Sequence, residues 1–318
     1  MCTSDSSSTH YMSPKPTPYN FAPEYKREKW AAVAASCKRN ITDGQLVSSS
    51  PYAYTHASNP INRSRNRYTN VLPYDRTRVQ LKTLAGGSDY INALILRLAQ
   101  NKYIAAQGPL PSTIHHFWAM CFDQAIQQNV DVILVVMVTP LQERGVVKCA
   151  KYWPSKGDGV IQLGSSLAAE DLAYGDLELE WISSEEKDLF TISNFRLSAG
   201  SITKNVLHYY YGKWEDSMPP TRTGPLAALA SELDLARKAF PGIIPIIHCS
   251  AGVGRTGTLI AYDHFCHGDA IYSSDDPVYE TISKLREQRM MMVQTWQQFK
   301  FLYDVVDNMV GEEAAHQD

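Results

Sequence analysis

The sequence lacks the features that mark a membrane-spanning or a secreted protein. Its longest apolar run is Val132 to Val138, whereas crossing a bilayer takes about 20 consecutive apolar residues. Residues 1–20 are polar and rich in serine and proline, without the apolar core of a signal peptide. The 6 cysteines are scattered without paired spacing, which argues against a disulfide framework and favours a reducing compartment. We therefore expect a cytoplasmic protein, with the nucleus open as a second location, and no membrane partner.

A surplus of basic charge is also missing. Lys and Arg number 30 against 33 Asp and Glu, a net charge of −3, so no overall positive field points to nucleic acid as a partner. The histidines, cysteines and carboxylates form no cluster with the spacing of metal ligands, and no internal repeat is visible. We expect a monomer that needs no metal or cofactor, and any site for an anion must be local.

The length of 318 residues suits one large domain with a well-buried core. Residues 1–20 hold too few apolar side chains to fold and are predicted to be a disordered tail. Within this tail, Ser13-Pro14 and Thr17-Pro18 are candidate sites for proline-directed kinases. Residues 21–310 are predicted to form the folded domain, and residues 311–318 a short polar tail.

Hydrophobic periodicity predicts an alternation of helices and strands along the folded part. Apolar residues recur at helical spacing or alternate as in strands, and turn-forming residues mark the breaks. The predicted helices cover residues 24–39, 114–128, 225–240, 256–265, 278–286 and 296–309, the predicted strands cover 132–138, 177–182, 189–197, 204–211 and 243–247, and residues 42–60 are predicted to be a loop. This pattern indicates one α/β domain in which helices flank a central mixed sheet.

One segment carries the clearest chemical signal: His248-Cys249-Ser250-Ala251-Gly252-Val253-Gly254-Arg255-Thr256-Gly257. A buried strand ends, a cysteine and a loop of small residues follow, and a helix begins. Gly252 and Gly254 permit backbone angles that other residues resist, so the loop can turn successive N–H groups inward as a nest for an anion. The N-terminus of the following helix adds positive charge, and the guanidinium of Arg255 can grip two phosphate oxygens.

The same surroundings would stabilise a thiolate at Cys249. A free cysteine titrates near pH 8.5, and sites of this kind lower the pKa to about 3.5–7.5. The thiolate is the nucleophilic form of the residue. The hydroxyl of Thr256 can bond to the sulfur and help it leave in a second step, and His248 can hold the loop from behind. The segment therefore predicts a nucleophilic cysteine that acts on a phosphate group without a metal.

Each of these residues alone has an ordinary explanation. Cys249 can be an inert buried residue, the two glycines can form a turn, and Arg255 can be a surface charge. A joint Cys-x5-Arg-Thr arrangement between a buried strand and a helix has no such explanation. No Lys-Ser/Thr pair closes the loop, so it is not a nucleotide-binding P-loop.

This segment resembles the signature loop of the protein tyrosine phosphatases, and the similarity covers nearly the whole chain from about residue 25. The resemblance implies a cysteine-dependent phosphatase fold with a highly twisted mixed sheet. It also implies hydrolysis of phosphotyrosine in proteins through a phospho-cysteine intermediate on Cys249. Further family motifs follow in order: Asn66-Arg67-Tyr68 with Val71, Pro73 and Asp75, Asp89 to Ala93, Tyr103 to Pro109, Phe117-Trp118, Lys148 to Pro154, Trp214-Glu215-Asp216, and Gln294-Thr295 with Gln298.

The resemblance implies roles for residues outside the signature loop. Asp216 would protonate the leaving phenolate and then act as the base that activates water, while Gln294 would orient that water. Trp214 would belong to a mobile lid that excludes bulk water. Glu143 would pair with the loop arginine and hold the loop closed, and Lys148 would support the site from the strand beside it.

For the substrate, the resemblance implies a deep cleft. Tyr68 and Val71 would flank the phosphotyrosine ring, the loop from Ser250 to Gly254 would bind its phosphate, and Gln298 would contribute to substrate binding. Asn70 stands where many relatives carry an aspartate that binds the peptide backbone. An amide can still accept that hydrogen bond, but it brings no charge.

Two further positions depart from the family pattern. Glu215 replaces the usual proline beside the acid, so we expect a less stiff lid and, from the like charge, a raised pKa of Asp216. Met291 stands where relatives that accept a second phosphotyrosine carry glycine, and its side chain is expected to narrow that neighbouring pocket.

Three other functions remain open at this level. A non-catalytic phosphotyrosine-binding module would keep the anion nest, but Cys249, Arg255, Asp216 and Gln294 are all present, which favours an active enzyme. A dual-specificity phosphatase would have a shallow cleft without the wall around Tyr68. A sulfur transferase of the rhodanese type would use a cysteine loop without needing Asp216 or Gln294.

Overall fold

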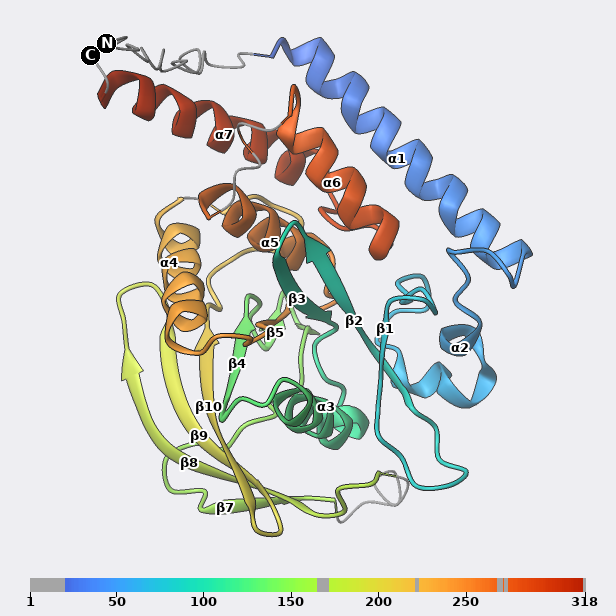
Figure 1. Cartoon of the computed structure of the whole chain (residues 1–318), viewed down its shortest axis with the longest axis vertical. Coiled ribbons are helices and arrows are strands. Elements are labelled where there is room, and N and C mark those ends of the chain that lie inside the picture. Colours follow the sequence, from blue (N-terminus) through green and yellow to red (C-terminus); the bar gives the residue numbers. More distant parts are fainter. Residues whose placement is uncertain (1–20, 165–171, 221–222, 268–270, 272–273, 317–318) are drawn as a thin grey trace, which may run out of the picture.

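The computed structural model describes residues 21–164, 172–220, 223–267, 271 and 274–316. These residues form one α/β domain on a nine-stranded mixed sheet with the strand order β1-β2-β3-β11-β4-β10-β9-β8-β7 (Figure 1). The predicted fold, a twisted mixed sheet flanked by helices, is confirmed. The predicted N-terminal tail and both Ser/Thr-Pro pairs lie outside the described residues.

The central strand of the sheet leads directly into the signature loop. β11 lies between β3 and β4 and runs parallel to both, and β10 runs parallel to β4. All residues of β11 are buried, because it has a neighbour on each edge and apolar cores on both faces. The strands are β1 (Arg78–Gln80), β2 (Tyr90–Leu98), β3 (Asn101–Ala106), β4 (Val132–Met137), β7 (Val160–Leu163), β8 (Leu177–Glu186), β9 (Thr191–Ala199), β10 (Ile202–Tyr210) and β11 (Ile246–His248), with a separate hairpin of β5 (Gln142–Glu143) and β6 (Val146–Val147).

Helices cover both faces of the sheet (Figure 1). One apolar core lies between the sheet and α3, and another lies between the sheet and the C-terminal helices α4 to α7. Among the described residues, no helix is both long and apolar enough to cross a membrane. The helices are α1 (Pro23–Leu46), α2 (Thr55–Ser58), α3 (Ile114–Gln127), α4 (Gly224–Ala239), α5 (Gly254–Cys266), α6 (Pro277–Gln288) and α7 (Trp296–His316), with the 3-10 turns η1 (Pro60–Arg65) and η2 (Pro111–Thr113).

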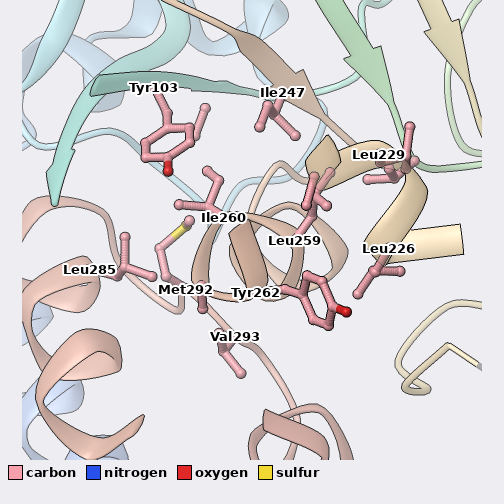
Figure 2. Close-up of a cluster of buried hydrophobic side chains, with 14 of the residues drawn as sticks. Tyr103, Leu226, Leu229, Ile247, Leu259, Ile260, Tyr262, Leu285, Met292 and Val293 are labelled. Atoms are coloured by element: carbon pink, nitrogen blue, oxygen red, sulfur yellow. The ribbon is translucent and has the colours of Figure 1, made fainter. Parts of the chain in front are cut away.

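The helix after the signature loop is anchored deep in the second core. Leu259 and Ile260 of α5 are fully buried there, with Ile247 of β11 and Leu285 of α6 nearby (Figure 2). Because β11 and α5 are both held in this core, the loop that connects them has two fixed ends. This is the condition for a preorganised anion site.

The N-terminal helix is longer than predicted. α1 continues from Pro23 to Leu46 instead of ending at residue 39, and α2 forms within the predicted loop 42–60. The Asp43-Gly44 pair suggests a turn, but in the structure Gly44 lies within α1 and packs closely against the backbone of Tyr52. A Cβ atom at Gly44 would lie 1.8 Å from the carbonyl oxygen of Tyr52, so only glycine lets the chain pass this close to the helix.

The other predicted elements are found with shifted ends. The predicted strand 243–247 is shorter, since β11 begins only at Ile246. The strands β1, β2, β3, β5, β6 and β7 were not predicted. α7 continues to His316, so the helix runs into the segment predicted to be a polar tail. At these positions, contacts with neighbouring strands and helices outweigh the local helix or strand propensity of the sequence.

Candidate active site

The signature loop closes around the sulfur of Cys249. Cys249 is 3% exposed, and the backbone N–H of Gly252 donates to its Sγ at 3.3 Å. Gly252 has a φ of 71°, and a Cβ atom there would lie 2.1 Å from the carbonyl oxygen of Ala106. Glycine is therefore required both by the backbone angle and by the close approach of β3.

The pKa of the Cys249 thiol lies below its ordinary value. Burial alone would raise it, but the charge of Arg255 and hydrogen bonds from Thr256 and Gly252 stabilise the thiolate more strongly. The hydroxyl of Thr256 is buried, and among the described residues it makes no hydrogen bond to another group. It is therefore available to the sulfur of Cys249.

Arg255 joins the signature loop to the predicted lid. Its side chain is 1% exposed, and Nη1 donates to the carbonyl oxygen of Trp214 at 2.7 Å. Nη2 lies 3.2 Å from Oδ1 of Asp216, an ion pair without hydrogen-bond geometry. Within the described part of the chain, Nε and Nη2 have no hydrogen-bond partner, so the N–H groups on these two nitrogens are available to phosphate oxygens.

Asp216 is held in the site by two long-range contacts. Nζ of Lys148 donates to its Oδ2 at 2.7 Å, and its backbone N–H donates to Oε1 of Glu143 at 2.9 Å. Burial acts to raise the pKa of Asp216, but Lys148 and Arg255 outweigh it and hold the pKa below its ordinary value. Without a bound phosphate, the side chain of Asp216 is therefore a carboxylate at neutral pH.

The expectation that Glu215 raises the pKa of Asp216 is not met. The side chain of Glu215 is 65% exposed, and its Oε2 lies 3.9 Å from Nη2 of Arg144. It points to the turn of the β5–β6 hairpin and is screened by water, so the cations beside Asp216 decide the pKa.

The segment around Asp216 is docked on the start of α7. The indole of Trp214 is buried and donates to the carbonyl oxygen of Met218 at 2.9 Å. Oγ1 of Thr295 donates to the carbonyl oxygen of Ser217 at 2.8 Å. Ser217 has a φ of 63°, so the chain turns sharply just after the acid. We call residues 213–218 the acid loop.

The predicted glutamines lie next to the signature loop. Oε1 of Gln298, which is buried, accepts the backbone N–H groups of Gln294 at 3.0 Å and Thr295 at 3.3 Å. A Cβ atom at Gly254 would lie 3.2 Å from Oε1 of both glutamines. Gln294 therefore lies beside the signature loop. The amide oxygen of Gln298 is occupied by hydrogen bonds from the backbone at Gln294 and Thr295, which fix the position of Gln294.

Tyr68 forms a wall of the cleft and is fixed to the signature loop. Its hydroxyl lies 2.9 Å from Oγ of Ser250, and Ser250 in turn donates to the carbonyl oxygen of Lys148 at 2.7 Å, so Tyr68 is the donor. Val71 is buried in the core beneath this wall, and Asn70 is exposed at its rim. The remaining loop residues, Ala251 and Val253, contribute backbone.

His248, the last residue of β11, is buried and contacts the start of the signature loop. Its Nδ1 lies 3.1 Å from the carbonyl oxygen of Cys249 and must be the donor, because a carbonyl can only accept. Nε2 must then accept from the hydroxyl of Tyr152 at 2.6 Å. Nε2 of His208, 2.7 Å from the same hydroxyl, therefore donates. Burial lowers the pKa of His248 to about 4 and that of His208 to about 3.

Arg289 contacts the signature loop, although none of the motifs above includes it. This fully buried arginine donates from Nε to the carbonyl oxygen of Gly252 and from Nη2 to that of Ala251, both at 2.9 Å. It also donates to Oδ1 of Asn92 at 2.9 Å. In a trans peptide the N–H points away from the carbonyl. Because Arg289 holds these two carbonyls on its own side, the N–H groups of the same two peptides face away from Arg289. The available signal was an arginine directly before the apolar run Met290 to Val293.

The chain is similar to proteins of known family. A family model described as protein-tyrosine phosphatase matches residues 62–308. Tyrosine-protein phosphatase 1 of Saccharomyces cerevisiae is 35% identical over 326 residues, which cover 89% of this chain and 95% of that protein. Tyrosine-protein phosphatase 1 of Schizosaccharomyces pombe is 35% identical over 259 residues, 77% of this chain but 44% of that longer protein.

Solved structures show the same fold. A structure of PTPN18, from work on its recognition of HER2 tyrosine phosphorylation sites, has a TM-score of 0.74 and 26% identity and covers 90% of this chain and 95% of that chain. PTPN18 in complex with HER2 phosphopeptides has a TM-score of 0.73 and 27% identity, covering 90% and 93%. With the family model matching most of the chain, this protein belongs to the protein-tyrosine phosphatase family.

Proposed function

We propose that the chain hydrolyses phosphotyrosine in proteins with Cys249 as nucleophile and Asp216 as acid and base. The observation that carries this assignment is the position of Arg255, which stabilises the thiolate of Cys249 and lies 3.2 Å from Asp216. A phosphate held by Arg255 and the loop N–H groups would thus contact the nucleophile and the acid at once.

In the first step, the thiolate attacks phosphorus while the bond from phosphorus to the tyrosine oxygen breaks. A sulfur–phosphorus bond forms, and Asp216 gives its proton to the departing phenolate. Arg255 and the loop N–H groups stabilise the charge on the phosphate oxygens. In the second step, Gln294 orients a water, the carboxylate of Asp216 takes its proton, and the resulting hydroxide displaces the thiolate and forms inorganic phosphate.

Substrate binding prepares the acid. Without phosphate, Lys148 and Arg255 keep Asp216 ionised. When the phosphate dianion binds Arg255, it offsets that positive charge and adds negative charge near the carboxylate, so the pKa of Asp216 rises. Protonation of the acid is thus linked to occupation of the site.

The wall formed by Tyr68 supports selectivity for phosphotyrosine over phosphoserine, because a short side chain cannot carry its phosphate past the wall to Cys249. The partners we propose are phosphotyrosine-containing proteins of the cytoplasm or nucleus, with no role for nucleic acid or membrane, and the working form is a monomer. Among the described residues, no group of three or more histidine, cysteine, aspartate or glutamate side chains is arranged as ligands of a metal ion.

The test uses matched phosphotyrosine and phosphoserine peptides with the purified protein and the Cys249→Ser variant. We expect rapid release of phosphate from the phosphotyrosine peptide only, and none with the variant, which should still bind the peptide. Equal rates on both peptides would indicate a dual-specificity enzyme. Binding without turnover by the unmodified protein would indicate a non-catalytic binding module.

A further inference from the structure

A pocket beside the wall of the cleft has no part in the chemistry above. It has a volume of about 490 Å³ and lies between the end of α1, the α2–η1 segment and the chain that follows Tyr68. We call it the Leu72 pocket after one of the buried residues that line it. In Figure 1 these elements lie together on the side of the domain where α1 ends.

The floor of the Leu72 pocket is apolar. Tyr54, Ala57, Leu72 and Met290 line it and are buried together in a small core cluster of their own. Arg63 is the one charged residue among those that line the pocket, and it is exposed. A concave site of this kind gains most from burying an apolar side chain, because a charged one would lose hydration without finding a buried partner.

Two strongly exposed apolar residues stand close in sequence to residues that line the Leu72 pocket. Leu46 is 76% exposed and Ile61 is 70% exposed, the two highest values for large apolar residues in the described part of the chain. Leu46 directly follows Gln45, and Ile61 stands two residues before Arg63, both of which line the pocket.

The Leu72 pocket and the catalytic cleft share one wall. Thr69 and Asn70 line the pocket, and they directly follow Tyr68, whose hydroxyl lies 2.9 Å from Ser250 in the signature loop. Consecutive Cα atoms are about 3.8 Å apart, so this wall is about 8 Å long. An extended peptide advances about 3.3 Å per residue and covers that length in two to three residues.

We propose that the Leu72 pocket is a second substrate subsite, which takes a large apolar side chain of the leucine, methionine or phenylalanine type within about three residues of the phosphotyrosine. The proposal rests on the proposed function, since the occupant is the substrate peptide itself. The uncharged Thr69 and Asn70 on the shared wall fit an apolar neighbour better than a basic one.

The first test is a series of singly phosphorylated peptides with alanine at every flanking position. Leucine, aspartate or lysine replaces one alanine at a time, up to three residues on either side of the phosphotyrosine. Leucine at one or two positions should raise kcat/KM about tenfold over alanine, whereas aspartate and lysine there should not. Equal values for leucine and alanine at every position, or a preference for aspartate through Arg63, would overturn the proposal.

A second test fills the pocket. Ser58 lines it and is exposed, so Ser58→Trp can occupy the mouth without disturbing a core. Ser64→Trp is the matched control, because Ser64 is also exposed but does not line the pocket. Ser58→Trp should lower the leucine-to-alanine ratio of kcat/KM to about one, and Ser64→Trp should leave it near ten. Turnover of p-nitrophenyl phosphate reports whether each variant keeps an intact catalytic centre.

The outcomes separate this proposal from the proposed function. If no phosphotyrosine peptide is hydrolysed, the catalytic assignment fails, and binding of the leucine and alanine peptides to Cys249→Ser protein still tests the pocket by fluorescence anisotropy. If turnover is normal but the leucine advantage survives in Ser58→Trp, the subsite lies elsewhere. If light scattering shows a dimer that Ser58→Trp dissociates and no leucine advantage exists, the pocket holds a second copy and the proposal fails.

Discussion

Oε1 of Glu143 accepts the backbone N–H of Asp216 at 2.9 Å, a contact between residues 73 positions apart in the sequence. The other oxygen of Glu143 lies 3.9 Å from Nη1 of Arg255 and 4.0 Å from Nζ of Lys148. One carboxylate of the β5–β6 hairpin therefore contacts the acid loop, the signature-loop arginine and the lysine beside them. It holds the acid loop over the site.

Replacing Glu143 should loosen the acid loop. In Glu143→Ala the backbone N–H of Asp216 loses its acceptor, so the closed loop is less populated and kcat should fall about tenfold with a smaller change in KM. Glu143→Gln keeps an amide oxygen for that N–H and should lose less. Steady-state kinetics on one phosphotyrosine peptide measures both, and an equal loss in the two variants would mean that charge rather than the hydrogen bond matters.

The alkaline limb of the pH profile should respond to Lys148 and not to Glu215. Lys148 donates to Oδ2 of Asp216 at 2.7 Å and stabilises its carboxylate, so Lys148→Met should raise the pKa of Asp216 and move the alkaline limb of kcat/KM to higher pH. Glu215→Gln should leave that limb in place, because Glu215 faces Arg144 and water. A downward shift of the limb in Glu215→Gln would show that its charge does reach Asp216.

Alkylation should reveal the thiolate of Cys249. Its pKa is lowered by Arg255 and the loop, whereas burial raises the pKa of Cys149 to about 12. The rate of iodoacetamide inactivation plotted against pH should therefore have a midpoint below the pH of about 8.5 typical of free cysteine. Arg255→Ala should move this midpoint to higher pH. The Cys249→Ser protein gives the rate at which iodoacetamide reacts with the other cysteines. A midpoint that stays at the free-cysteine value would rule out an activated thiol.

Met291 should limit the use of tandem phosphotyrosines. It has a φ of 61°, a conformation that glycine adopts without strain, so Met291→Gly should fold normally and open the neighbouring pocket. The unmodified protein should show similar kcat/KM for singly and doubly phosphorylated forms of one peptide, whereas Met291→Gly should favour the doubly phosphorylated form. A tenfold preference already present in the unmodified protein would contradict this.

Two buried histidines should make the fold sensitive to mild acid. Burial lowers the pKa of His208 to about 3 and that of His248 to about 4, against about 6.5 in the unfolded chain. Because the folded values are depressed, this stability is present above pH 6.5 and is lost as the pH falls towards them. Each histidine should lower the free energy of unfolding by about 2 kcal/mol between pH 7 and pH 5.

Urea unfolding at those two pH values measures the effect. His208→Gln keeps an N–H donor for Tyr152 but cannot titrate in this range. Its loss of stability between pH 7 and pH 5 should be smaller by about 2 kcal/mol. An unchanged loss in this variant would mean that His208 is not neutral in the folded protein.

The signature loop could be read from sequence because its chemistry lies in consecutive residues. A buried strand that ends at His248 and a helix that begins at Gly254 fix the two ends of the loop, and the glycines, the cysteine and the arginine between them determine what it binds. The family resemblance added Asp216, Gln294 and Glu143, which the structure brings to the same site. Elements with strong periodicity, such as α3 and α4, were predicted within a residue or two for the same local reason.

The remaining features depended on which distant segments the fold brings together. Arg289 reaches the carbonyl of Gly252, 37 positions earlier, and no local pattern marks such a contact. Glu215 was expected to act on its neighbour Asp216, yet its exposed side chain faces Arg144 of the hairpin. Local sequence determines backbone conformation and side-chain chemistry. The charges that surround a side chain, however, come from segments that are distant in sequence and that the fold brings together, as Lys148 and Arg255 are brought to Asp216. Only the tertiary structure could therefore decide the pKa of Asp216.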